Sequence, residues 1–134
     1  MADQRPLAGL RIVDTDLAID YLRDRLPGAA QVQAWLERDL VRFSALTSFE
    51  LRLGTDFTRR ADAIGKLLMA RTLPLDHASA LLAGQIYVRL RGLGLEIGVN
   101  DSLVAGTCLR FGLPLATRNV RHFERVAGLR LIPF

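Results

Sequence analysis

The sequence predicts a single α/β domain with a central, mostly parallel sheet wrapped by helices. Short apolar segments that are typical of strands alternate along the chain with segments whose apolar residues recur every third or fourth position. Strands that alternate with helices are typical of a parallel sheet. A length of 134 residues, of which 50% are hydrophobic, suits one domain with one core.

The first expected strand, residues 10–13, ends in two carboxylates, Asp14 and Asp16, which precede a helical pattern. An Asp at the end of a strand points into the crevice in which open α/β sheets bind ligands. Asp is also a favoured N-cap, so either side chain can instead serve only the first amides of the following helix. That helix is expected to end at Pro27-Gly28.

The next expected elements are a helix over residues 29–38 and a strand over residues 40–45. The helix places Trp35 in the core rather than on a base-stacking surface. The strand alternates apolar with polar residues, as a half-buried strand does. Thr47 or Ser48 is expected to cap the helix that follows.

Glu50 lies beside an apolar stripe formed at four-residue spacing by Phe49, Leu53 and Phe57. A carboxylate in such surroundings is costly unless it is compensated. Two interpretations stay open: Glu50 has a chemical role, or it completes a capping box with Thr47, three residues earlier.

Residues 72–75, which include a proline, are expected to form a strand at a sheet edge, where a missing amide matters least. Asp76 is expected to cap the next helix, and His77 is assigned to the surface. Arg89 lies near the end of this helix, where a cation favours the helix dipole. Apolar residues recur in it at every fourth position, namely Ala78, Leu82, Ile86 and Leu90.

Three glycines at positions 92, 94 and 98 follow a helix rather than a strand, so they do not form a dinucleotide-binding loop. We expect them to form a loop that delivers Asn100 and Asp101 to the start of a nearly all-apolar helix, residues 103–111. Such a helix is expected to be buried at the centre of the domain. Asp101 is then either its N-cap or a third carboxylate facing the crevice.

A short strand ending at Ala116 is followed by the polar group Thr117, Arg118 and Asn119, so polar side chains again follow a strand end. Arg118, Arg121 and Arg125 are spaced to share one face of a short helix. Residues 129–132 are expected to form a final strand.

The formal net charge is +4, and Lys66 is the only lysine among 18 basic residues. Arginine forks suit phosphate oxygens, so this balance permits a nucleic-acid partner without requiring one. A single cysteine excludes a disulfide framework and a cysteine-based zinc site. The chain shows neither a secretory signal nor a membrane span, so we expect a cytoplasmic protein in which residues 1–9 are a loosely ordered extension.

The predicted topology brings the ends of the strands that precede Thr15 and Thr117 to the same edge of the sheet, so Asp14 and Asn119 are expected to meet there. Glu50 and Asp101, at helix starts, can reach that edge too. Clustered carboxylates repel unless a cation neutralises them, and oxygen ligands without His or Cys favour Mg²⁺ or Mn²⁺. Phosphodiester hydrolysis is the matching chemistry.

A phosphate-receiver domain also has acids after its first strand, but it needs a lysine near a late strand end, and Lys66 lies elsewhere.

In four segments the chain resembles the PIN-domain ribonucleases, in particular the VapC-type toxins of toxin–antitoxin pairs. The segments are residues 12–16, 44–51, 97–105 and 115–124. The resemblance implies a three-layer α/β/α fold and Mg²⁺- or Mn²⁺-dependent endoribonuclease activity. It also implies a homodimer and a VapB-like antitoxin that covers the acidic cleft.

Carried over residue by residue, the resemblance makes Asp14, Glu50 and Asp101 the metal-binding acids and adds Asn119 to the catalytic set. Asp14 and Asp101 would hold the metal, while Glu50 would orient or deprotonate the attacking water. Asp16 stands where relatives more often have Asn, and Asn119 where many carry a fourth acid. The number of metal ions therefore stays open, as does a catalytically weak PIN-like module that binds RNA or a partner. The supporting residues implied are Thr15, Asp16 and Thr117, and the RNA-binding residues are Arg118, Arg121 and Arg89.

Overall fold

A computed structural model describes residues 9–133, so most of the extension expected at residues 1–9 lies outside the described part. Four strands form one sheet in the order β3-β2-β1-β4, and every neighbouring pair is parallel. This confirms the predicted parallel α/β sheet, and β3 lies at its edge as expected. The strands are β1 (Arg11–Val13), β2 (Val41–Ser44), β3 (Thr72–Leu73) and β4 (Leu115–Ala116).

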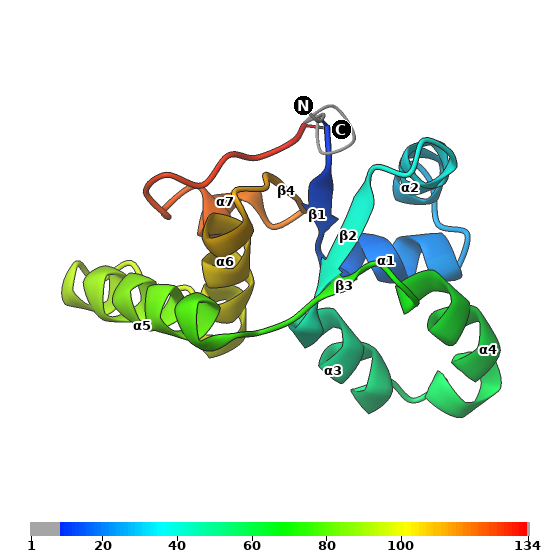
Figure 1. The fold of residues 1–134 in the computed structure, drawn as a ribbon, viewed down its shortest axis with the longest axis horizontal. Helices are drawn as coiled ribbons and strands as arrows, with labels where there is room; N and C mark the ends of the chain where they lie inside the picture. Colours follow the sequence, from blue (N-terminus) through cyan, green and yellow to red (C-terminus); the bar gives the residue numbers. More distant parts are fainter. Residues whose placement is uncertain (1–8, 134) are drawn as a thin grey trace, which may run out of the picture.

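Helices cover both faces of the sheet, with α1 and α2 on one side and α5 and α6 on the other (Figure 1). The fold is therefore the expected three-layer α/β/α arrangement. Between residues 9 and 133, no helix is long and apolar enough to cross a membrane. The helices are α1 (Thr15–Leu22), α2 (Gly28–Glu37), α3 (Ala45–Leu53), α4 (Phe57–Leu68), α5 (His77–Gly92), α6 (Val99–Phe111) and α7 (Val120–Phe123).

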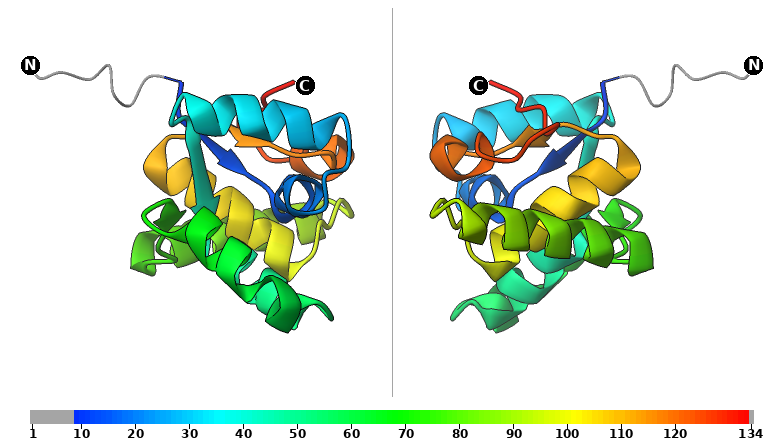
Figure 2. Two further views of the ribbon diagram at one scale, coloured as in Figure 1. Left: turned by 90° about the vertical axis from the view of Figure 1, so that its right-hand side faces the viewer. Right: turned by 90° about the vertical axis from the view of Figure 1, so that its left-hand side faces the viewer.

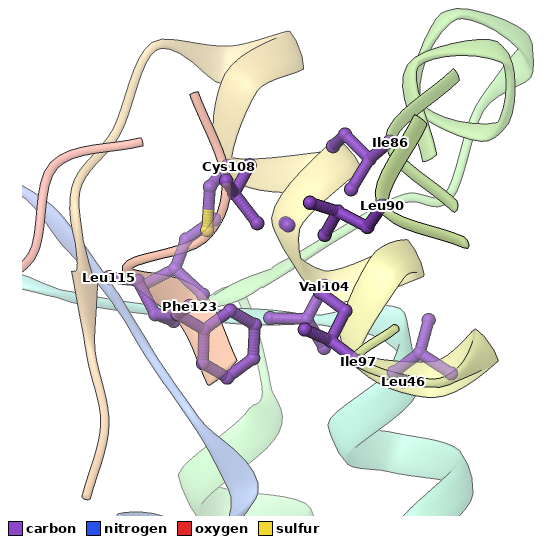
Figure 3. Packing of buried hydrophobic residues seen from close by; sticks show 11 residues of the cluster. Leu46, Ile86, Leu90, Ile97, Val104, Cys108, Leu115 and Phe123 are labelled. Carbon is purple, nitrogen blue, oxygen red and sulfur yellow. The ribbon is translucent and has the colours of Figure 1, made fainter. Parts of the chain in front are cut away.

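Two hydrophobic clusters lie on opposite faces of the sheet, because successive strand residues point to opposite sides. Ile12 and Leu115 face α5 and α6, and Figure 3 shows Leu115 gathered there with Phe123 of α7. Val13 and Ala116, the next residues along, face α1 and α2. The pairing of Val13 with Ala116 therefore fixes which residues follow at the edge: Asp14 after β1 and Thr117 after β4.

The central helix is α6, as predicted, and α5 packs across it (Figure 2). A Cβ added at Gly106 of α6 would lie 2.6 Å from the Ser79 carbonyl oxygen and 2.7 Å from the Ala83 nitrogen. The two backbones thus approach each other closely. The buried residues at the start of α5 are accordingly the small Ser79 and Ala83. Of the four apolar residues expected to share one face, Ile86 and Leu90 are buried, Leu82 is half-buried and Ala78 is exposed.

Two predictions about the helix after β2 are wrong. The strand runs directly into α3, so Ser44 is the N-cap and Thr47 and Ser48 lie inside the helix. The capping-box interpretation of Glu50 therefore fails. The apolar stripe fails as well, because Phe49 is 54% exposed and Leu53 66% exposed.

The expected final strand at residues 129–132 is also not formed. The structure has only an isolated parallel bridge between Leu131 and Leu115. The Leu115 amide donates to the Arg130 carbonyl at 2.9 Å, and the Ile132 amide donates to the Leu115 carbonyl at 2.9 Å. The segment thus covers the outer edge of β4 without extending the sheet.

Candidate active site

Asp14 lies where β1 ends, and it both caps α1 and faces the residues that follow β4. Its Oδ1 accepts a hydrogen bond from the Thr15 amide at 2.9 Å, and its Oδ2 accepts one from the Thr117 hydroxyl at 2.7 Å. The side chain is buried at 9% exposure, and the Thr117 side chain at 1%. Both interpretations of Asp14 from the sequence, N-cap and crevice carboxylate, are compatible with this geometry.

The environment of Asp14 disfavours its charge. Burial, followed by repulsion from Asp16, raises its pKa from 3.8 to about 7, although hydrogen bonds from Thr117 and Thr15 oppose the rise. The charge of Asp101 adds a smaller repulsion. No Lys, Arg or His side chain of the described chain bonds to Asp14, so its ionised form has no cationic partner.

Glu50, on α3, is joined to the end of β1 through Thr15. The Thr15 hydroxyl donates to Glu50 Oε1 and contacts the Thr47 hydroxyl at 2.9 Å. The Asn100 amide donates to Glu50 Oε2 at 3.4 Å. Both oxygens of this half-buried carboxylate are therefore oriented by neighbours from α1 and α6.

Asp101 lies in the first turn of α6, whose N-cap is Gly98, so Asp101 does not cap the helix. Its Oδ2 accepts from Asn119 Nδ2 at 3.2 Å and lies 3.0 Å from His122 Nδ1. Asn119 is thus beside Asp101, on the turn between β4 and α7. Sequence reasoning overlooked His122, although it follows Asn119 by three residues, a spacing that places two side chains on one helical face.

Asp16 is bound mainly by backbone amides. Its Oδ1 accepts from the Leu17 amide at 2.7 Å, and its Oδ2 from the Arg118 amide at 3.0 Å and the Thr117 hydroxyl at 3.4 Å. Burial raises its pKa in spite of these bonds. Asp16 therefore ties the start of α1 to the turn after β4.

The three arginines expected on one helical face are not so arranged, because α7 spans only four residues and contains only Arg121. Arg118 precedes the helix, and its Nε lies 3.5 Å from Oδ2 of buried Asp20 and 3.9 Å from Oδ2 of Asp16. Arg125 follows the helix and donates to the carbonyls of Leu95 and Glu96.

Of the arginines expected to bind RNA, Arg121 is exposed on α7, close in sequence to Asn119. Arg89 lines an apolar groove between α5 and the segment after α7, together with Arg125 and Val126. No residue of the acidic set lines this groove, so Arg89 is not brought to the site by the described structure.

The donor set fits a divalent cation in its chemistry. Asp14, Glu50 and Asp101 offer hard oxygen ligands, and the raised pKa of Asp14 reflects burial together with neighbouring carboxylates. Across residues 9–133, however, no three His, Cys, Asp or Glu side chains are gathered as a ready-made metal site. A bound cation would have to draw the carboxylates together.

Comparison with known proteins agrees with this arrangement. A PIN-domain family profile matches residues 11–129. The chain is 30% identical over 124 residues to the tRNA(fMet)-specific endonuclease VapC of Shigella flexneri, covering 89% of this chain and 93% of that protein. It is 31% identical to ribonuclease VapC19 of Mycobacterium tuberculosis, covering 90% of this chain and 98% of the relative.

A solved structure, DNA-bound VapBC from Salmonella typhimurium, superposes with a TM-score of 0.76 at 25% identity, covering 92% of this chain and 97% of that one. The range matched by the family profile includes Asp14, Glu50, Asp101 and Asn119. The chain therefore belongs to the PIN-domain family and, within it, to the VapC-type ribonucleases.

Proposed function

We propose that this chain is a Mg²⁺- or Mn²⁺-dependent endoribonuclease, the toxin of a toxin–antitoxin pair, which hydrolyses phosphodiester bonds in RNA. The observation that carries the proposal is the buried Asp14 carboxyl, which has no cationic partner among residues 9–133 and lies beside the carboxylates of Asp16 and Asp101. A protein gains no stability from such an arrangement, whereas a divalent cation would be held by it. Membership of the VapC-type ribonucleases supports the same chemistry.

Asp14 and Asp101 would hold the cation, and Glu50 would complete the set. When bound, the cation would neutralise charge on the phosphate under attack. Glu50, held through Thr15 and Asn100, would orient the attacking water and accept its proton. The water oxygen then forms a bond to phosphorus as one ester P–O bond breaks. Exposed Arg121 would contact the RNA backbone.

A small VapB-like antitoxin is the proposed protein partner. Support comes from the similarity to solved VapBC complexes, in which a VapC chain is found together with VapB. The antitoxin would cover the acidic cleft. We further propose a cytoplasmic homodimer.

The second candidate function is a catalytically weak module that binds RNA or a partner. The observation in its favour is Asn119, whose amide donates to Asp101 where many relatives supply a fourth acid. Mapping of cleavage sites on total RNA with Mg²⁺ or Mn²⁺, and with EDTA, separates the two candidates.

We expect metal-dependent cleavage by the wild type, none in EDTA, and its loss in Asp14→Asn and Asp101→Asn. Both substitutions are also expected to relieve growth arrest on expression. Exposed Asp62 of α4 offers the matched control, and Asp62→Asn is expected to cleave normally. Cleavage that persists in EDTA or in Asp101→Asn would contradict the proposal.

A further inference from the structure

His122 is a conspicuous polar residue without a role in the proposed chemistry. It lies on α7, and its side chain is 40% exposed. Its Nδ1 is 3.0 Å from Asp101 Oδ2, and Asn119 Nδ2 is 3.2 Å from the same oxygen. The two nitrogens lie 2.9 Å from each other, a contact in which the role of Nδ1 depends on the tautomer of the ring.

The chemistry of the contact determines the state of the imidazole. Two tautomers fit these distances: a protonated Nδ1 donates to Asp101 Oδ2, whereas a bare Nδ1 accepts from Asn119 Nδ2. A carboxylate oxygen only accepts hydrogen bonds and is a stronger partner than a neutral amide, which favours the tautomer that donates to Asp101. Neutral His122 is therefore expected to be protonated at Nδ1 and bare at Nε2. The hydrogen bond made by one ring nitrogen selects the tautomer in this way.

The convergence on Oδ2 also orients the carboxylate of Asp101. None of the hydrogen bonds in the described structure uses its Oδ1, so that oxygen is left for a cation. The turn that carries Asn119 and His122 holds Asp14 as well, because the Thr117 hydroxyl donates to Asp14 and accepts from the Asn119 amide at 3.0 Å. One short turn thus orients two carboxylates from different elements.

We infer that His122 is a positioning residue: its Nδ1–H, together with Asn119, fixes Asp101 with Oδ1 presented to the metal. The inference rests on the proposed function of the site. Groups that orient a metal-binding side chain typically change metal affinity by about 10- to 100-fold when removed.

Two isosteric substitutions separate the role of Nδ1 from that of the rest of the ring. The side-chain amide nitrogen of Asn reproduces a donor near the position of Nδ1, whereas that of Gln reproduces one near Nε2. The chain contains one other histidine, His77, which is exposed in the first turn of α5 and serves as the control position.

The experiment measures Mn²⁺ binding to the full chain by calorimetry, together with RNA cleavage. We expect His122→Gln and His122→Ala to weaken Mn²⁺ binding by about tenfold or more, and His122→Asn to stay within about threefold of the wild type. His77→Gln should bind as the wild type does. If His122→Gln matches the wild type, or His122→Asn is as weak as His122→Gln, the inference is wrong although the proposed function stands.

A second measurement needs no metal and no substrate. At about pH 8.5, where an ordinary imidazole is neutral, the ring nitrogen chemical shifts of His122 should report a protonated Nδ1. Asp101→Ala, which leaves no acceptor for the Nδ1 hydrogen, should abolish this preference. A bare Nδ1 in the metal-free wild type would overturn the inference, whatever the activity of the protein.

Discussion

The burial of Asp14 predicts that the metal-free protein becomes less stable as the pH rises from about 4 to about 7. The folded state raises the pKa of Asp14 from 3.8 to about 7, so between these values the folded protein holds a proton that the unfolded chain has released. Stability therefore falls with rising pH. At 1.36 kcal/mol per pKa unit, full ionisation costs about 4 kcal/mol, of which about 2.5 kcal/mol develops between about pH 5 and about pH 8.

Asp14→Asn removes this dependence without removing the contacts. The Asn oxygen can still accept from the Thr15 amide, and its nitrogen can donate to the Thr117 hydroxyl. Urea unfolding in EDTA at several pH values gives the free energy of unfolding of both proteins. Titrating groups that do not interact with Asp14 contribute equally to both proteins, so their contributions cancel in the difference.

The advantage of Asp14→Asn over the wild type should grow by about 2.5 kcal/mol from about pH 5 to about pH 8. Asp62→Asn, at an exposed site, should leave the pH dependence of the wild type unchanged. A constant difference between Asp14→Asn and the wild type across this range would refute the argument that ionisation of buried Asp14 destabilises the folded protein. Saturating Mn²⁺ should reverse the order at high pH, because only the wild type offers the carboxylate.

Substitutions at Thr117, Gly106 and Gly84 test the contacts that hold the site and its helices in place. Thr117→Val removes the hydroxyl that donates to Asp14 and should lower both cleavage and the free energy of unfolding, the latter by about 1–3 kcal/mol in urea titrations, whereas Thr117→Ser should retain most of both. Gly106→Ala should destabilise the protein by about 1–3 kcal/mol in the same assay, because the new Cβ meets the backbone of α5. Gly84→Ala, at a helical position with nothing within 4 Å of the new Cβ, should instead stabilise it by up to about 1 kcal/mol. Equal effects of the two alanines would contradict the close approach of α5 and α6.

Most strands and helices were predictable from the apolar pattern of their residues, although the break between α3 and α4 was not. The buried Val41–Ser44 strand and the apolar α6 illustrate this. The residues at which helices begin were less predictable. The identities of Thr47 and Ser48 do not show that β2 continues into α3 without a loop. The N-cap is Ser44 because the backbone turns from strand to helix at that residue. Phe49 and Leu53 kept an apolar spacing but lie on the exposed side of that helix.

The candidate acids could be chosen from the sequence because Asp14 follows a strand and Glu50 and Asp101 lie near helix starts. The groups that form hydrogen bonds with these acids could not be chosen in this way. Pairing of Asp16 with the Arg118 amide joins residues 102 positions apart, and the contact of His122 with Asp101 depends on where the turn after β4 is placed. Such contacts depend on tertiary structure, so they cannot be predicted from the pattern of neighbouring residues in the sequence.

The position of β4 beside β1 has a consequence for biosynthesis. Strand β1 pairs with a strand that is made about a hundred residues later, since Val13 pairs with Ala116. Loop closure over such a separation is slow, and no shorter nascent chain can complete it. A growing polypeptide therefore carries Asp14 without Thr117, Asn119 or His122, and the acidic centre is assembled only after the segment that holds β4 and α7 has been translated.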